Sequence, residues 1–324
     1  MIYVCKDAKD AAIIPDICAV YMHNIQNIRE TWLILFTTPI YVVVIGLEMF
    51  LSHWQQKRLY TVKDTVENIY LTLSNMGLDL LFRAVSLSVL AFAGQFAFGS
   101  IHTAWLYWIA LVIGEDFMFY WLHRIDHYCR FFWATHVTHH SCEKLNLTVG
   151  FRSSVFEPLY RFIYFIPLAL CGFKAIDIVF IYSATQIWGI LVHTEYVKSL
   201  GPLEWILTTP SHHRVHHASN TLYLDKNLGM LLIIWDRMFG TFQKELPANT
   251  YEPIRYGLTT NLTSHHPLHV IFHEWVAIVK DLRRAPNAHA AYMYIFGPPG
   301  WSHDGSRHTS AQLRKAYFDK KHDL

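Results

Sequence analysis

Long apolar runs separated by short polar connections occupy much of the chain up to Val192. The runs are Trp32 to Leu51, Leu71 to Phe98, Ala104 to Leu122, Val155 to Phe173 and Ala175 to Val192. A helix needs about 20 residues to cross a hydrocarbon core about 30 Å thick, and these runs reach or approach that length. Because five such runs exceed what one soluble core requires, the pattern predicts an all-α, polytopic membrane bundle of about four to five spans.

The connections between the runs predict the topology. Two short links, Gly99 to Thr103 and Gly172 to Lys174, predict helical hairpins, so residues 52–70, residues 123–154 and everything after His193 fall on one face. That face carries most of the basic residues near the runs, namely Lys57, Arg58, Lys63, Arg124, Arg130, Lys144, Arg152, Lys198 and Arg214. By the positive-inside rule this face is predicted to be cytoplasmic, in the endoplasmic reticulum membrane of a eukaryote or the inner membrane of a bacterium.

The polarity of the chain changes near both ends and predicts three regions. These are an N-terminal segment over residues 1–30, a membrane-embedded catalytic domain over residues 31–245, and a C-terminal cytoplasmic or interfacial extension over residues 246–324. The first 30 residues lack a basic stretch followed by an apolar core, so we expect the first span to serve as an uncleaved anchor. In the extension, Leu268 to Leu282 has helical apolar periodicity. It predicts an amphipathic helix that either lies in the membrane interface or caps the cytoplasmic domain.

The composition supports a membrane protein and excludes several other classes. Hydrophobic residues make up 52% of the chain and charged residues 16%, against about 25% charged in typical soluble domains. This balance excludes a disordered chain, and a net charge of +2 without a basic cluster argues against a nucleic-acid partner. The five cysteines show no pairing pattern. The 21 histidines are too many to be purely structural.

Histidines cluster at the ends of the apolar runs with a repeated spacing. The clusters are His123-Arg-Ile-Asp-His127, His136-Val-Thr-His139-His140 and His212-His213-Arg-Val-His216-His217, with a single His193 at the end of the fifth run. In a helix, residues four apart share a face, so each cluster can direct imidazoles to one site. The H-x2-H-H spacing occurs twice, which is far more specific than one histidine pair.

Two metal ions explain this set better than packing does. Nine or ten converging imidazoles would repel one another if protonated, and a metal compensates for their burial. They are too many for one ion and suit two ions with four or five ligands each. A closed zinc site normally includes cysteine, whereas nitrogen-rich sites with open positions are typical of redox-active iron. The sequence thus predicts a dimetal, specifically di-iron, site in a cytoplasmic helical cap.

Three more residues are possible additions to the site. His212 adjoins the third cluster. Asp126 could hold an imidazole N–H or pair with Arg124 or Arg130. Asn227, ten residues after His217, could supply an oxygen or simply cap a turn.

The spacing of the clusters after an apolar hairpin resembles the fatty acid hydroxylase/sterol desaturase superfamily of membrane di-iron enzymes. The surrounding segments, among them Trp133-Ala-Thr-His136, Arg152-Ser-Ser, His193-Thr-Glu195 and Trp235-Asp-Arg-Met-Phe-Gly240, are similar to its alkylglycerol monooxygenase-like branch. The resemblance implies as metal ligands His123, His127, His136, His139, His140, His193, His213, His216 and His217, with His213 preferred to His212.

The resemblance also implies an activity and its partners. It implies O2-dependent hydroxylation or desaturation of a lipid C–H bond, in an alkylglycerol ether lipid, a fatty acyl chain or a sterol-like substrate, with a separate electron donor or reductase. The branch is associated with tetrahydrobiopterin. Two positions differ from it, since Tyr128 stands where the animal enzymes have an acidic residue and Leu228 where an aromatic is usual.

Two other functions use the same ligands. A two-zinc membrane hydrolase would need neither O2 nor electrons, although such sites usually include bridging carboxylates, which the clusters lack. A histidine-rich metal carrier or transporter would place polar residues along several spans at mid-depth, whereas these histidines gather at one end.

Overall fold

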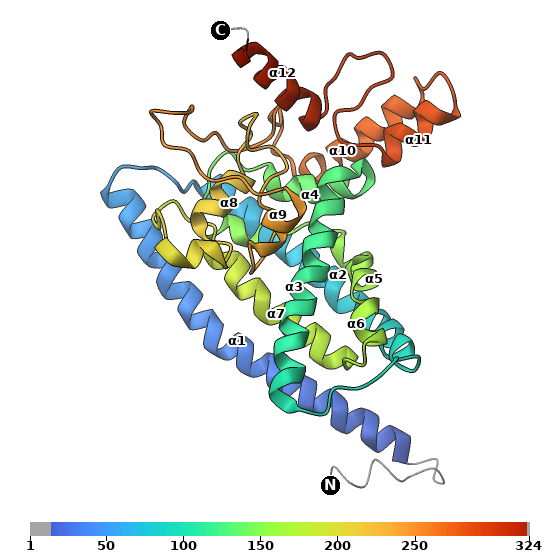
Figure 1. The fold of residues 1–324 in the computed structure, drawn as a ribbon. Helices are drawn as coiled ribbons and strands as arrows, with labels where there is room; N and C mark the ends of the chain where they lie inside the picture. The colour runs from blue at the N-terminus through green and yellow to red at the C-terminus, as the bar shows by residue number, and fades with distance from the viewer. Residues whose placement is uncertain (1–13, 323–324) are drawn as a thin grey trace.

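The computed structural model describes residues 14–322, and within this range the chain folds into helices without a β-strand (Figure 1). Only two isolated bridges, Leu207 with Leu232 and Ala218 with Tyr256, join extended segments there. The predicted all-α class is confirmed for these residues. The predicted N-terminal segment lies partly outside them, because the description begins at Ile14.

Two long helices are apolar enough to cross a membrane by length and composition. They are α1 (Ile14–Trp54), whose candidate span is Thr31–Trp54, and α2 (Val62–Gly94). Large apolar side chains of α1 stay uncovered, and Val42 and Val43 are both 67% exposed. An apolar surface of this extent suits contact with lipid rather than with water.

Two further helices fill the centre of the bundle. They are α3 (Ala104–Tyr128) and α7 (Ala175–Leu191), which contact each other. Their core joins Leu111 of α3, Ile178 of α7 and Leu90 of α2. The two predicted hairpin links pack against each other, and Gly172 has a positive φ of 92°. A Cβ at Gly172 would lie 2.1 Å from the Gly99 carbonyl oxygen, so this close approach requires glycine.

The prediction of a continuous fourth span over Val155 to Phe173 is wrong. The segment forms three short helices, η2 (Glu157–Leu159), α5 (Arg161–Tyr164) and α6 (Ile166–Leu170). Proline has no N–H to donate and its ring clashes with the preceding turn. Pro158 and Pro167 each stand in the first turn of a new helix, which restarts the chain in a different direction.

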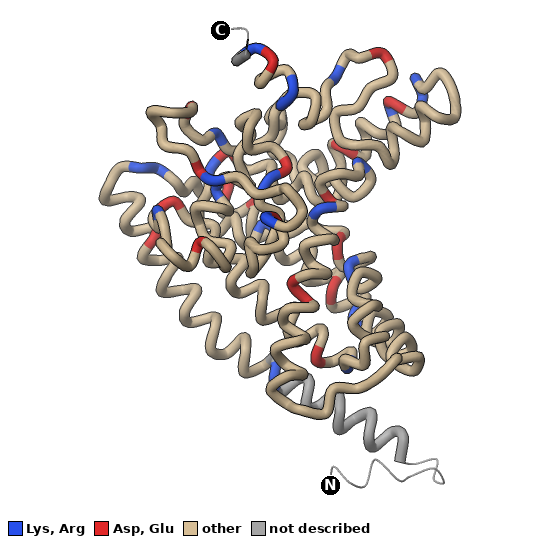
Figure 2. The backbone as a smooth tube through the Cα atoms, in the orientation of Figure 1, with Lys and Arg blue, Asp and Glu red and all other residues tan. Residues whose placement is uncertain are grey.

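A cap of shorter helices covers one end of the bundle. Its elements are α4 (Arg130–His140), η1 (Val149–Phe151), η3 (Gly201–Trp205), α8 (Pro210–His216), α9 (Ile234–Phe239), α10 (Pro267–Leu282), α11 (Ala288–Phe296) and α12 (Ser310–His322). Figure 2 shows that Lys, Arg, Asp and Glu concentrate in this cap, while the part of α1 that is not grey is almost entirely tan. The predicted helix over Leu268 to Leu282 is confirmed as α10, which buries Val270 and Ile278 and exposes Leu268 and Val276.

Candidate metal centre

Four elements bring the predicted histidines to one place beneath the cap. His123 and His127 lie in the last turns of α3, and Cys129, in extended conformation, separates α3 from α4. This break redirects the chain so that α4 presents the second cluster toward the end of α3. His193 follows α7 directly, and α8 carries the third cluster.

The nine histidines divide into two groups, each with its ligand atoms within 4.8 Å of one another. The five-histidine group contains His123, His127, His136, His140 and His216. The four-histidine group contains His139, His193, His213 and His217. The neighbours His139 and His140 therefore belong to different groups, as do His216 and His217. Each H-x2-H-H cluster thus contributes to both groups.

The imidazole nitrogens within each group are spaced as a metal ion requires. Nε2–Nε2 distances are 3.1 Å for His123 with His136, 3.2 Å for His136 with His140, 2.9 Å for His193 with His213 and 3.1 Å for His193 with His217. Imidazole binds first-row metals at about 2.1 Å, so ligands about 90–110° apart have nitrogens about 3.0–3.4 Å from each other. The side chains therefore fit one metal per group.

Contacts on the outer side of the rings fix which nitrogen faces the centre. The Nδ1 atoms of His123, His139 and His193 lie 2.7–2.8 Å from the backbone carbonyl oxygens of Leu228, Arg152 and Gly189. A carbonyl can only accept, so each Nδ1 donates and each Nε2 keeps its lone pair. The Nε2 atoms of His127 and His216 are buried without a hydrogen-bond partner, which is unfavourable unless another species binds them.

Two carboxylates and one hydroxyl lie behind the five-histidine group. His127 Nδ1 is 3.2 Å from Asp225 Oδ1. His136 Nδ1 is 3.1 Å from Ser154 Oγ and 3.9 Å from Asp126 Oδ2. Asp126 accepts a hydrogen bond from the Tyr160 hydroxyl at 2.9 Å. Asp126 thus stands behind His136.

Burial favours the neutral form of several of these imidazoles. It lowers the pKa of His139 to about 4, and it holds the pKa values of His213 and His216 well below their usual range, with neighbouring imidazoles adding to the effect for those two. A neutral imidazole retains the lone pair that a metal binds.

The other two candidate residues serve the framework of the cap. His212 Nδ1 accepts from the Thr209 backbone N–H at 3.3 Å within the capping box of α8. The Asn227 amide donates to the carbonyls of His212 and Gln243 and accepts from the Gln243 N–H. Neither residue joins the two histidine groups.

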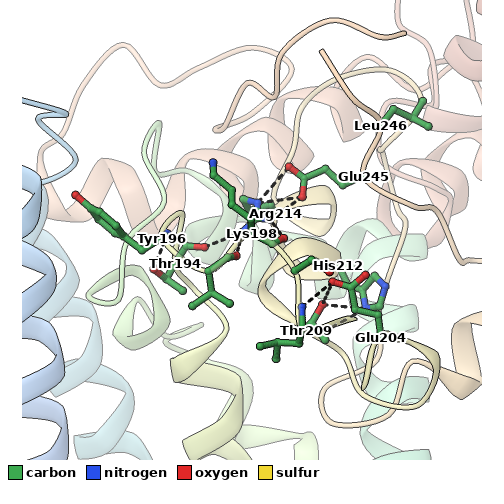
Figure 3. Close-up of polar contacts among 12 residues, drawn as sticks. Thr194, Tyr196, Lys198, Glu204, Thr209, His212, Arg214, Glu245 and Leu246 are labelled. Carbon is green, nitrogen blue, oxygen red and sulfur yellow. Dashed lines mark hydrogen bonds and ion pairs between the residues drawn. The ribbon is translucent and has the colours of Figure 1, made fainter. Parts of the chain in front are cut away.

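Buried arginines hold the segments that carry the clustered histidines. The spacing of the histidines did not predict this role of the arginines. Arg214, between the histidines of the third cluster, points away from them. It donates to Glu245 at 2.7 Å and to the carbonyls of Thr194, Val197 and Lys198 (Figure 3). It thereby ties α8 to the loop that follows His193.

Arg152 holds the second cluster in the same way. Its guanidinium donates to the Thr138 carbonyl, Asn68, Ser141 and Glu67 at 2.7–3.0 Å, and its carbonyl accepts from His139. The signal for it in the sequence is a basic residue in an otherwise weakly charged stretch after the second cluster.

Glu48 is the one charged residue of the first apolar run, and it is 4% exposed. Its carboxylate accepts from the Thr194 hydroxyl at 2.5 Å, from the Leu147 N–H at 2.8 Å and from the Tyr60 hydroxyl. It thus links α1 to the residue after His193. Asp116 of α3 likewise accepts from the Leu231 and Leu232 N–H groups.

A cavity of about 410 Å³ reaches the histidines from among the long helices. We call it the membrane-side cavity. Its walls run from Leu33 and Ile34 of α1 past Val179 and Ile187 of α7. At its inner end are five of the nine histidines, His123, His136, His139, His193 and His213. An apolar chain entering between α1 and α7 would meet both groups.

Part of the chain matches a known protein family. Residues 108–241, which include all nine clustered histidines, match the family model described as fatty acid hydroxylase. The chain thus contains a fatty acid hydroxylase domain, and the resemblance predicted from the sequence is confirmed.

Three individual relatives are also similar to the chain. The chain is 40% identical over 197 residues to alkylglycerol monooxygenase of Xenopus tropicalis (61% of this chain, 43% of the relative). It is 34% identical over 269 residues to alkylglycerol monooxygenase of Danio rerio (82% and 59%) and over 135 residues to an ornithine lipid hydroxylase of Rhizobium tropici (41% and 40%). The chain thus spans about two fifths to three fifths of these curated relatives. No solved structure matches it.

Proposed function

We propose that the chain is a multi-pass membrane oxygenase that uses two iron ions and O2 to hydroxylate a lipid C–H bond. The observation that carries this proposal is the pair of histidine groups at the inner end of a cavity that begins among lipid-exposed helices. The relatives support the same reaction class. We place the histidine centre on the cytoplasmic side of the membrane, where the basic residues of the cap lie.

The ligand chemistry favours iron over zinc. Each group consists of imidazoles, and within residues 14–322 neither group includes a cysteine or a carboxylate. Iron held by nitrogen ligands with open positions supplies O2 activation. The nine histidines named above would hold the two ions, five at one and four at the other. Asp225, Ser154 and Asp126 would orient the rings of the five-histidine group from behind.

The chain's own residues would bind and orient the substrate. Apolar walls from α1 and α7 would take a hydrocarbon chain and exclude water from the histidines. Polar side chains such as Asn75 and Ser153 line the cavity as well. A lipid whose polar portion is near the reacting carbon fits such a lining, and we therefore propose an alkylglycerol as the preferred substrate.

The reaction balances with one external donor. One oxygen atom of O2 enters the C–H bond and the other leaves as water, while the donor supplies two electrons and two protons. Hydroxylation of the carbon beside an ether oxygen gives a hemiacetal, which separates into an aldehyde and free glycerol. The aldehyde is a product that no hydrolase would form from an ether.

The test is turnover of a long-chain alkylglycerol by the purified, iron-loaded chain in nanodiscs, with isotopically labelled O2 and a chemical reductant. We expect the aldehyde, O2 consumption in equal amount, and one labelled oxygen atom in the initial product. A fatty acid and a sterol, run in parallel, test the substrate class.

A variant pair controls for the site. His139→Ala with His216→Ala removes one ligand from each group and should abolish product, whereas His289→Ala removes an exposed histidine and should not. Product formed without O2, or release of a long-chain alcohol in place of the aldehyde, would overturn the proposal in favour of hydrolysis.

A further inference from the structure

The membrane-side cavity carries charged side chains that a hydrocarbon chain does not require. Asp79 of α2, Glu157 of η2 and Arg161 of α5 all line it. In Figure 1, α5 lies below the cap, and it contacts α3. Charged side chains among apolar helices are costly and usually have a function. We call one part of the cavity wall the polar recess, which consists of Asp79, Glu157, Arg161, Tyr182 and Gln186.

The polar recess is assembled from two helices that contact each other, α2 and α7. Asn75 and Asp79 are four residues apart in α2, and Tyr182 and Gln186 are four residues apart in α7. Each pair therefore shares one helix face, and all four residues line the same cavity. Arg161 joins the two helices, because its guanidinium pairs with the Asp79 carboxylate and lies 4.5 Å from the centroid of the Tyr182 ring. Polar groups from both helices thus reach one space.

The recess has hydrogen-bonding capacity to spare. The side-chain nitrogen of Gln186 is buried and has no hydrogen-bond partner among residues 14–322, which is unfavourable unless a ligand provides one. Glu157 Oε1 accepts from the Tyr182 hydroxyl at 3.3 Å, and a carboxylate can accept several more hydrogen bonds. A suitable ligand therefore accepts from Gln186 and donates to Glu157. A hydroxyl group does both.

The charges at the recess are balanced. Asp79 pairs with Arg83 at 2.8 Å and also with Arg161, and Glu157 supplies a second carboxylate. Two carboxylates and two guanidiniums thus line the same cavity. A charged head group would compete with these ion pairs or lie beside a like charge, which is unfavourable, whereas a neutral head group would do neither. The recess therefore favours a neutral, hydroxylated head group over a carboxylate or a phosphate.

The recess adjoins the five-histidine group. One imidazole nitrogen of His136 and one carboxylate oxygen each of Asp126 and Glu157 lie within 4.8 Å of one another. In an alkylglycerol, four bonds separate the oxygen of the secondary hydroxyl from the carbon beside the ether oxygen. A hydroxyl bound by Glu157 would therefore bring that carbon close to the five-histidine group. The alkyl chain would then extend along the apolar wall at Leu33 and Ile34 of α1.

We propose that the polar recess binds the two free hydroxyls of a glycerol head group and thereby determines which lipid carbon reaches the histidines. Gln186 donates to one hydroxyl, and Glu157 accepts from the other. Both are positioning residues, because they hold the head group and not the reacting carbon. The inference rests on the proposed function and names the residues that select its substrate.

The test measures binding separately from turnover. The full iron-loaded chain in nanodiscs, kept without O2 and without reductant, is titrated with tritiated 1-O-hexadecylglycerol, and empty nanodiscs correct for lipid that only dissolves in the bilayer. Three unlabelled lipids compete for the site. Hexadecanoylglycerol keeps both hydroxyls but replaces the ether with an ester, hexadecyl propyl ether lacks both hydroxyls, and 1-O-hexadecylglycerol 3-phosphate carries negative charge.

We expect the head group to decide the affinity. Hexadecanoylglycerol should compete about as well as hexadecylglycerol, because it presents the same two hydroxyls. Hexadecyl propyl ether and the phosphate should compete about tenfold more weakly, since the first loses the hydrogen bonds of both hydroxyls and the second adds a charge.

The variants should change this selectivity. Gln186→Leu should weaken binding of hexadecylglycerol about tenfold and leave that of hexadecyl propyl ether within about twofold, because only the first lipid uses the amide. Gln55→Leu makes the same substitution at an exposed position outside the cavity and should change neither affinity. Glu157→Gln removes one negative charge and should improve competition by the phosphate relative to hexadecylglycerol. The unfolding temperature of each variant shows whether the fold survives.

The outcomes separate this inference from the proposed function. Equal affinity for hexadecylglycerol and hexadecyl propyl ether, or a Gln186→Leu protein that keeps the selectivity of the unmodified chain, would overturn the recess as a head-group site while leaving the oxygenase intact. Selectivity for the two hydroxyls that Gln186→Leu removes, in a chain that hydroxylates no lipid, would support the recess and count against the proposed function.

Discussion

The five-histidine and four-histidine groups share one ligand chemistry but are supported in different ways. Behind the five-histidine group stand three side chains, Asp225, Asp126 and Ser154, in addition to the backbone carbonyls of Leu228 and Lys226. Behind the four-histidine group the described contacts are backbone carbonyls, those of Arg152 and Gly189. The charged residues near this second group, Glu48 and Arg214, hold the chain that carries the ligands instead.

The two groups should therefore be sensitive to different substitutions. Carboxylates next to an imidazole N–H raise its basicity and strengthen the metal bond, so a change there should act locally on one metal. Carbonyls depend on the backbone staying in place, and buried ion pairs keep it there. We therefore expect the four-histidine group to lose its metal when these buried ion pairs are broken. In the five-histidine group, metal affinity should change without loss of the fold.

The largest expected effect is on the scaffold of the four-histidine group. Arg152→Leu leaves Glu67, 7% exposed, without its arginine partner and with only the His265 imidazole 3.3 Å from its carboxylate, and it removes the contacts that position the carbonyl behind His139. Breaking a buried pair in this way costs about 3–5 kcal/mol. Unfolding by denaturant in detergent should show this loss, and one of the two metals should be lost with it. Arg255→Leu, at an arginine whose side chain is 64% exposed, serves as the matched control and should change stability little.

A smaller effect on the same group is expected at Glu48. Glu48→Gln keeps the shape, and its amide oxygen can still accept from the Leu147 N–H and the Tyr60 hydroxyl, but the negative charge is lost and the NH2 group cannot accept from the Thr194 hydroxyl. Hydrogen bonds to charged groups contribute about 1.5–3 kcal/mol, and we expect a loss of stability in that range. Glu252→Gln changes an exposed carboxylate and should be neutral. A stable Glu48→Gln protein with both metals tightly held would show that α1 does not support His193.

The five-histidine group should respond to Asp225→Asn without a change in fold. Asp225 has a φ of 53°, a conformation that asparagine tolerates well, and its amide oxygen can still accept from His127. Only the negative charge is lost. Changes in such supporting residues typically weaken metal binding about 10–100-fold. Competition with a chelator should release one metal more readily while the other stays bound. Equal weakening of both metals would contradict independent support.

The smallest expected effect is at Ser154. Ser154→Ala removes the hydroxyl near His136 Nδ1, but Asp126 remains at 3.9 Å and can take over the contact. A neutral hydrogen bond contributes about 1 kcal/mol, so metal affinity should fall about fivefold or less. Combining Ser154→Ala with Asp126→Asn should cost more than the two single changes together. Strict additivity, measured by the same chelator competition, would show that Asp126 does not compensate.

The sequence predicted that these nine histidines lie together, but not how they divide into two groups. The spacing of His136, His139 and His140 indicated a shared site, but which neighbour faces which metal depends on how α3, α4 and α8 pack, and that is not a local property. The break in the fourth apolar run could have been predicted from the sequence, because Pro158 and Pro167 both lie within it. The length of the apolar run alone favoured a continuous span. A cavity of about 300 Å³ lined by His127 and His140 could not be predicted, because it brings Trp133 together with Glu274 and Arg307, more than a hundred positions away.

We propose that the nine histidines hold two metals, five at one and four at the other. The most direct measurement is the metal content of the purified full chain by elemental analysis after removal of loosely bound ions. We expect about two iron per chain, about one in His193→Ala or in His123→Ala, and close to none when both are changed, with His289→Ala unchanged. A single iron in the unmodified chain, or two irons that survive the double substitution, would contradict this assignment of ligands to two metals.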